Sequence, residues 1–269
     1  MKKTLSGIIL GIVYVFLYAP LLVMVFFSFN SDRSTSAFAG FSLKWYGELF
    51  SRSDTLIALR NTLILAVLSS VIATLIGTIA AVGIYRTKNR LLGNTLMTVT
   101  NIPMMNPDIV TGVSLMLLFV FFGRLLGAST SLNFGTLLIA HVTFNIPYVL
   151  LNVLPKLKQT DKRVFEAALD LGCTPTQAFF KVVLPAISSG IVSGMLMAFT
   201  LSLDDFVISY YTSGADFQTL PLKIFAMTKK TVKPDMYALS SLIFVTILVL
   251  MIITNLLQLK GDKSNEKGR

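Results

Sequence analysis

Charged residues are scarce in this 269-residue chain. They make up 13% of it, and 54% of the residues are hydrophobic, whereas a soluble domain has about 25% charged residues. Charged residues are missing from several apolar runs of about 20 residues, and each run is long enough to cross a hydrocarbon core of about 30 Å. Alternating segments of about 10 residues, typical of a β-barrel, are absent. The composition therefore predicts an all-α membrane protein.

The chain is equally poor in residues that build metal sites and active sites. Cys173 is the single cysteine and His141 the single histidine, which excludes an internal disulfide and argues against a Cys/His metal site. No GxxxxGK[ST] phosphate loop occurs. Neither catalytic residues, nor metal ligands, nor a bound cofactor are therefore expected, and a membrane-embedded enzyme is disfavoured.

The basic residues predict an orientation rather than a nucleic-acid partner. The net charge is +10, but the basic residues fall in short loops between apolar runs. More than half of the 23 Lys and Arg residues share a side with both termini, so the positive-inside rule places both termini in the cytoplasm. The apolar run after Lys2 and Lys3 continues to Phe29 without a clear cleavage site, which predicts a retained first span.

Six membrane spans are expected in a single transmembrane domain covering residues 1–269. An inverted-repeat transporter is disfavoured because no strong internal repeat is visible. A cytoplasmic segment at about 160–184 separates the fourth and fifth spans, and a polar, disordered tail is expected at 261–269. The spans cover about 7–29, 60–85, 94–122, 134–154, 186–211 and 237–259.

Two spans carry features that bear on function. The third is broken at Asn101–Pro103 and again at Asn106–Asp108, and irregular backbone at membrane depth is tolerated only where protein or a water-filled cavity covers it. The fifth contains Gly190 and Gly194, a GxxxG pattern typical of close helix packing.

Three carboxylates fall inside these spans: Asp108, Asp204 and Asp205. A charge at the bilayer centre costs at least about 2.5–3.5 kcal/mol and usually marks a pathway. Asp108 and Asp204 lie roughly 27–28 Å beyond the inner helix starts at Arg90 and Pro185, at 1.5 Å per residue. The three acids can therefore share one level in the outer half of the membrane, where they would attract a multivalent cation. The alternative is that they cap kinked helices or pair with Lys or Arg near the outer surface.

Three further polar or aromatic residues allow two interpretations each. Trp45, the single tryptophan, is either an interfacial anchor or an aromatic face for an ammonium ligand. Ser202 lies one turn from Asp205 and either donates a hydrogen bond to the acidic site or satisfies its own backbone. His141 is interpreted as a hydrogen-bonded packing residue rather than a proton relay.

The stretch from Glu166 to Pro185 predicts two short helices at the cytoplasmic surface. Asp161 or Thr160 can cap the first helix, and Gly172 can end it in a left-handed conformation. Thr174–Pro175 can begin the second, with Thr174 as the N-cap and Pro175 in the first helical position. The two helices form an elbow before the fifth span.

The same stretch carries a recognisable spacing, EAA-x3-G-x9-I-x-LP with Val in place of Ile. It resembles the EAA motif of permease subunits of type I binding-protein-dependent ABC importers. In that family the elbow is the coupling helix that docks into a cleft on the ATPase subunit, with the Glu at the contact. The resemblance implies this ATPase-coupling role for the matching residues: Glu166, Ala167, Ala168, Gly172, Leu184 and Pro185.

Other segments narrow the resemblance to the permeases of polyamine importers. It implies that Asp108, Asp204, Asp205 and Trp45 lie on a path for spermidine or putrescine, with Ser202 as a neighbouring candidate. The segments that carry it are Lys44–Tyr46, Asn106–Val110, Leu203–Val207 and Thr219–Phe225.

The resemblance also implies an assembly in a bacterial cytoplasmic membrane. It would contain this six-span permease, a second related permease, two ATPase subunits and an extracytoplasmic polyamine-binding protein. ATP and magnesium would bind the ATPase subunits, so this chain would not itself be an enzyme. Two alternatives stay open: the same architecture with another substrate, and an ion-coupled secondary transporter.

Overall fold

The chain folds into helices that group into two compact units. The computed structural model describes residues 2–32, 37–51, 53–127, 132–215, 217–229 and 234–267. Within these ranges the regular structure is helical, and an isolated β-bridge joins Asn30 to Phe41. The first unit comprises Met1–Leu59 and Leu220–Val249, and the second comprises Arg60–Thr219 and Leu250–Arg269. The fold class predicted from composition is confirmed.

The first unit surrounds a small apolar core made by Leu49, Ala58, Leu220 and Leu239. A buried lysine ties two of its helices together, because Lys223 Nζ lies 2.7 Å from Asp54 Oδ2 and 2.7 Å from Thr55 Oγ1. The helices of this unit are α1 (Lys2–Phe27), α2 (Lys44–Ser51), the start of α3 (Ser53–Arg86), α12 (Leu220–Thr228) and the first part of α13 (Pro234–Lys267).

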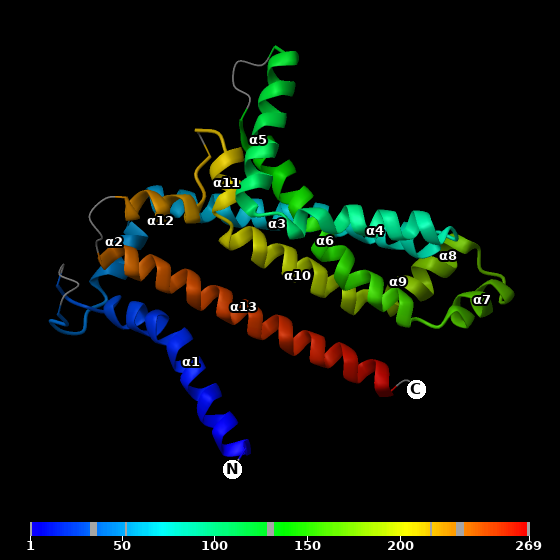
Figure 1. Ribbon diagram of the computed structural model, residues 1–269, viewed down its shortest axis with the longest axis horizontal. Helices are drawn as coiled ribbons and strands as arrows, with labels where there is room; N and C mark the ends of the chain where they lie inside the picture. The colour runs from blue at the N-terminus through cyan, green and yellow to red at the C-terminus, as the bar shows by residue number, and fades with distance from the viewer. Residues whose placement is uncertain are drawn as a thin grey trace. The chain divides into compact units, whose positions relative to one another are not determined.

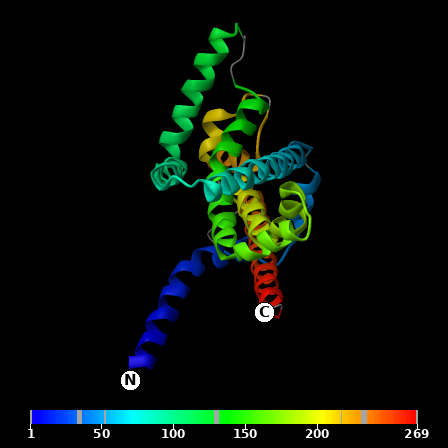
Figure 2. The same cartoon turned by 90° about the vertical axis from the view of Figure 1, so that its right-hand side faces the viewer.

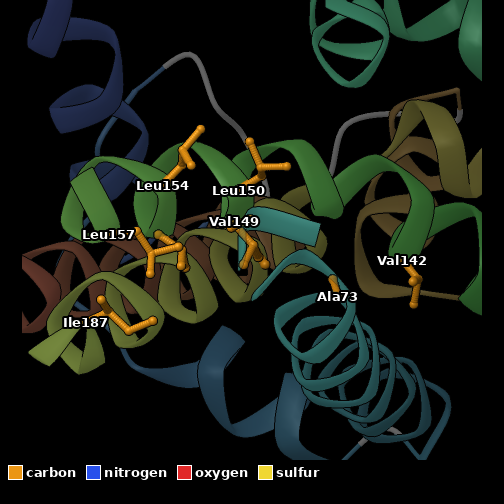
Figure 3. Packing of buried hydrophobic residues seen from close by; sticks show 10 residues of the cluster. Ala73, Val142, Val149, Leu150, Leu154, Leu157 and Ile187 are labelled. Carbon is orange, nitrogen blue, oxygen red and sulfur yellow. The ribbon is translucent and has the colours of Figure 1, made fainter. Parts of the chain in front are cut away.

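The second unit is built around α6 (Phe134–Gln159), which packs against α4 (Arg90–Met105), α5 (Asp108–Leu125), α10 (Ser188–Asp204) and α11 (Val207–Thr212). Asn133 starts α6 with a capping box that Thr136 completes. Figure 3 shows Val149 and Leu157 of α6 pointing toward α10, whereas Leu150 and Leu154 point to the other side of α6. This apolar core fixes α3, α6 and α10, the helices that carry the polar site, against one another.

Glycines allow three helices of this unit to approach closely. A Cβ added at Gly190 of α10 would lie 2.8 Å from the carbonyl oxygen of Asn152, and one at Gly194 would lie 3.1 Å from Val149 Cα. On α3, a Cβ at Gly77 would lie 2.8 Å from Val149 Cγ1. The packing role predicted for Gly190 and Gly194 is confirmed.

The close approach at Gly190 predicts a large effect of a small substitution. We expect Gly190→Ala to destabilise the protein by about 1–3 kcal/mol, the usual effect of overpacking a filled site, because the backbone carbonyl opposite cannot move aside. Thermal unfolding of the purified protein in detergent measures this. Gly83→Ala is the matched control, since a Cβ at that helical position meets open space. Equal melting temperatures for the two variants would contradict the prediction.

Five helices are long and apolar enough to cross a membrane in the described part of the chain, and a sixth span results if one bent helix pair is counted. The pair is Pro175–Ala186 with Ser188–Asp204, bent by 65°. The single helices are Ser6–Phe27, Ser53–Arg86, Asp108–Leu125, Phe134–Gln159 and Asp235–Ile253. The protein is therefore a multi-pass membrane protein.

The expected third span is two helices. Asn106 and Pro107 adopt extended conformations, with ψ of 142° and 135°, and they separate α4 from α5. Figures 1 and 2 show α5 turning away from the line of α4 at this point. The break predicted at Asn106–Asp108 is confirmed, but the one predicted at Asn101–Pro103 is wrong, because α4 accommodates Pro103 within its helix.

The last two expected spans also differ in extent. The fifth ends as a continuous helix at Asp204, because Asp205 is extended with ψ of 125°. The sixth begins at Pro234 and continues as α13 to Lys267, through most of the stretch predicted to be a disordered tail. That stretch contains Lys263, Glu266 and Lys267, which are good helix formers. Residues 268 and 269 lie outside the described ranges.

Candidate functional site

Ser202 lies at the centre of a buried polar cluster that joins three helices. Its Oγ accepts a hydrogen bond from Asn145 Nδ2 at 2.7 Å, lies 2.9 Å from Ser69 Oγ and lies 3.1 Å from His141 Nδ1. A hydroxyl has one donor and two acceptor positions, so these three partners occupy it fully. Ser202 is only 2% exposed, and its hydroxyl can contact a ligand only by giving up one of these partners.

Asp205 lies in the break between α10 and α11 and caps the second helix. Its carboxylate accepts hydrogen bonds from the amides of Ile208 at 3.3 Å and Ser209 at 2.8 Å. His141 Nε2 approaches the same carboxylate at 3.5 Å. A negative charge at a helix N-terminus is stabilised by the exposed amides and the helix dipole, so Asp205 is largely engaged by the protein itself.

Asp204 has a different environment although it is the adjacent residue. It ends α10 and is exposed, with the charge of Asp205 beside it. Two neighbouring carboxylates thus take different positions, one turned into the helix cap and one left open. Of the two, Asp204 is the acid that a cation can reach.

Asp108 is the first residue of helix α5. It is exposed, and its charge lies within electrostatic range of Tyr148 on α6. α5 packs against α11, where a Cβ at Gly112 would lie 3.0 Å from the Tyr211 ring. Figure 1 shows both helices rising from the level at which α4 and α10 end. Asp108 and Asp205 therefore both lie at the start of a helix, α5 and α11 respectively. The neighbour of Asp108 on α6 is Tyr148, whereas the neighbour of Asp205 is His141.

Trp45 belongs to the first unit, on α2, and is only 4% exposed. Its Nε1 donates to the carbonyl oxygen of Asn30 at 2.6 Å. Asn30 in turn holds the loop after α1, accepting from the Ala39 amide and donating to the Ala37 carbonyl, both at 2.8 Å. Trp45 is therefore packed against the chain, and its ring does not offer an open face to a ligand in this conformation.

The burial of Trp45 predicts a stability effect. We expect Trp45→Phe to lower the free energy of unfolding by about 1–3 kcal/mol, because it leaves a buried carbonyl without its donor. Thermal unfolding measures this, with Phe50→Leu on the exposed side of α2 as the control. Unchanged stability combined with a loss of uptake would instead favour a direct role on a transport path.

The elbow is built by the capping signals predicted from the sequence. Asp161 caps α7 (Lys162–Asp170) by accepting from the Arg163 amide. At its end Gly172 has a φ of +85°, and the amides of Gly172 and Cys173 bond to the carbonyls of Leu169 and Ala168. This is the Schellman arrangement, in which a left-handed glycine ends a helix.

The second half of the elbow leads directly into α10. Thr174 and Gln177 form a capping box at α8 (Pro175–Ala178), with Pro175 in the first turn. A π-helical turn, η1 (Phe179–Val183), and the short helix α9 (Leu184–Ala186) follow. The bend of 65° then separates this segment from α10. Beyond the bend, α10 continues to Asp204.

The motif residues divide into exposed and packed positions. Glu166 and Ala167 are exposed on α7 whereas Ala168 is buried, and Leu184 is half-buried beside the exposed Pro185. Behind α7, the guanidinium of Arg86 lies 5.9 Å from the ring centre of Phe165 and 6.0 Å from that of Phe179. A pocket of about 210 Å³ lies between these groups and Glu166. Glu166 is therefore exposed at the rim of this pocket, and Arg86 of α3 contacts the elbow through Phe165 and Phe179.

Sequence reasoning placed the acids and the elbow but missed the polar cluster. The sequence predicts His141 as a buried, hydrogen-bonded packing residue, which is confirmed, but it does not identify Ser69 and Asn145 as members of the cluster. The available signal was a set of polar residues inside apolar spans. Only the fold shows that they meet, because His141 and Ser209 lie on different helices. Within the described residues no group of three or more His, Cys, Asp and Glu forms a metal site.

Comparisons with known proteins identify similar chains. The family model described as "Binding-protein-dependent transport system inner membrane component" matches residues 73–263. The putrescine transport system permease protein PotI of Escherichia coli (strain K12) is 38% identical over 256 residues, covering 95% of this chain and 91% of PotI. The spermidine/putrescine transport system permease protein PotC of the same strain is 37% identical over 264 residues, covering 98% and 97%.

A solved structure shows the same fold. A chain of a bacterial ABC transporter involved in the import of the acidic polysaccharide alginate superposes with a TM-score of 0.74 over 96% of both chains. Its sequence is 14% identical, so this similarity concerns the fold alone.

Proposed function

Because the chain belongs to the family of binding-protein-dependent transport system inner membrane components, we propose that it is the permease subunit of an ATP-driven polyamine importer. The observation that carries the proposal is the construction of α10. One end of this helix continues from the EAA elbow, and the other end presents the exposed Asp204. α10 thus lies between the elbow, from which a bend of 65° separates it, and the exposed carboxylate of Asp204.

The acids favour a cargo with several positive charges. Asp204 and Asp108 are both exposed, and each is the terminal residue of a candidate membrane helix. Carboxylates within membrane-spanning proteins at such depth usually mark a pathway. Spermidine and putrescine carry separated ammonium groups that can pair with such carboxylates in place of water. The similar permeases PotI and PotC are named for putrescine and for spermidine and putrescine, which supports the same substrate class here.

The elbow supplies the coupling to ATP. The exposed Glu166 contacts an ATPase subunit, and closure of two ATPase subunits displaces α7 and α8. α10 has 17 residues, about 25 Å at 1.5 Å per residue. A displacement that crosses the 65° bend before α10 therefore reaches Asp204 through this helix. The path then opens toward the opposite side and the polyamine leaves the carboxylates. ATP and magnesium bind the ATPase subunits, and this chain supplies no cofactor site.

The remaining parts of the proposal concern assembly and orientation. A second, related permease completes the path, and an extracytoplasmic binding protein delivers the polyamine. The protein resides in a bacterial cytoplasmic membrane, with the elbow and both chain termini on the cytoplasmic side. The lysines and arginines around the elbow and the first turn of α1 support this orientation.

Reconstituted transport tests the proposal. The complex of this chain with the second permease, ATPase subunits and binding protein of its own transport system is placed in vesicles with labelled spermidine or putrescine. We expect the uptake to require ATP. Unlabelled polyamines should reduce the uptake of the labelled polyamine, and anions should not. Uptake that persists without ATP and follows a proton gradient would overturn the proposal in favour of a secondary transporter. Competition by an unrelated solute alone would overturn the substrate class.

A further inference from the structure

The break between α10 and α11 is half-buried at Asp205 and Phe206, and buried serines flank it on both sides. Asp205 leaves the helical conformation there, with φ of −62° and ψ of 125°. Ser202 in the last turn of α10 and Ser209 in the first turn of α11 are both buried. A bend of this kind at membrane depth needs polar partners from neighbouring helices.

His141 of α6 supplies these partners on both sides of the break. Its Nδ1 lies 3.1 Å from Ser202 Oγ, and its Nε2 lies 3.0 Å from Ser209 Oγ and 3.5 Å from Asp205 Oδ2. The side chain is 1% exposed. One rigid imidazole ring therefore joins the end of α10 to the start of α11.

The hydrogen bonds form a consistent directed chain. With the proton of the neutral imidazole on Nε2, that nitrogen donates to Ser209 Oγ and faces the Asp205 carboxylate, and Nδ1 accepts from Ser202. Ser202 can then accept from Asn145 Nδ2 and from Ser69. Ser202 is thereby joined to α3 and α6, and His141 Nε2 joins the same cluster to Ser209 of α11.

We propose that His141 is a positioning residue that fixes the α10–α11 break, keeps Asp205 in the cap of α11 and thereby presents Asp204 to the cargo. This inference rests on the proposed function, because the value of presenting Asp204 depends on a cationic substrate. A histidine that only filled space would affect stability but not the use of ATP for transport.

The first test measures polyamine transported per ATP hydrolysed in reconstituted complexes. We expect His141→Leu to lower this ratio by about tenfold, the usual worth of a buried hydrogen-bond partner, in complexes that still assemble. Ser209→Ala, which removes only the partner on the α11 side, should lower it in the same direction. Thr143→Ala is the control, because Thr143 lies on α6 but bonds only within its helix to Ile139.

Two outcomes overturn the inference. One is a wild-type ratio in assembled His141→Leu and Ser209→Ala complexes, and the other is an equal loss in Thr143→Ala. Should His141→Leu fail to assemble, Ser209→Ala decides the matter alone. Absence of ATP-dependent polyamine uptake in the wild type would instead overturn the proposed function, and the second test remains informative in that case.

The second test needs no transport. Cys173 is the only cysteine, so Cys173→Ser with Asp204→Cys places a single thiol at the end of α10. The rate at which a positively charged methanethiosulfonate reagent labels this thiol then measures how accessible position 204 is to a cation. We expect His141→Leu to change the labelling rate by about tenfold, in keeping with the loss of one buried partner, and Thr143→Ala to leave it unchanged. Identical rates with and without His141 would overturn the positioning role.

Discussion

Asp204→Asn is expected to reduce the maximal rate of polyamine uptake by about tenfold or more, because a hydrogen bond to a charged group contributes about 1.5–3 kcal/mol. The substitution preserves size and shape and removes only the charge. Since Asp204 is exposed at the end of α10, its loss should leave folding and assembly intact. Uptake into vesicles, normalised to assembled complex, measures the effect.

Matched variants separate the charge of Asp204 from other causes. Asp204→Glu keeps the charge and should retain most of the uptake. Asp170→Asn removes an exposed acid at the end of α7 and should have little effect. Asp205→Asn should act mainly on thermal stability, because Asp205 holds two amides of α11. Wild-type uptake in Asp204→Asn would show that this acid is not on the path.

The elbow could be predicted in detail because its signals are local. Asp161, Gly172, Thr174 and Pro175 each satisfy a backbone need within a few residues of themselves, so the sequence contains all the information required. The break at Pro107 is local for the same reason, because proline removes a donor and restricts the residue before it.

The different roles of the acids could not be predicted in this way. Asp204 and Asp205 are equivalent in the sequence, and only the direction of the chain after α10 decides which is exposed. Likewise, the bonds of His141 to Ser202 and Ser209 depend on α6 packing against the break. Pro103 was expected to break a span, yet helix α4 continues through it, a case of tertiary structure overriding a local preference.

Glu166→Ala is expected to weaken binding of the ATPase subunits and to lower uptake by about tenfold or more, since truncating one partner of a charged contact at an interface costs about 2–5 kcal/mol. Glu166 lies exposed on α7, and alanine preserves helix propensity. The permease itself should therefore remain folded. Co-purification of the ATPase subunits and uptake in vesicles provide two independent measurements.

The control for Glu166→Ala lies on the same helix. Asp170→Ala removes another exposed acid from α7 without touching the motif, and it should retain both ATPase binding and uptake. The binding of loaded binding protein to the opposite side of the complex should stay unchanged in both variants, because the elbow and Asp204 lie at opposite ends of α10. If Glu166→Ala retains wild-type co-purification and uptake, the elbow does not dock through this residue. If it loses binding protein as well, the defect lies in folding rather than in coupling.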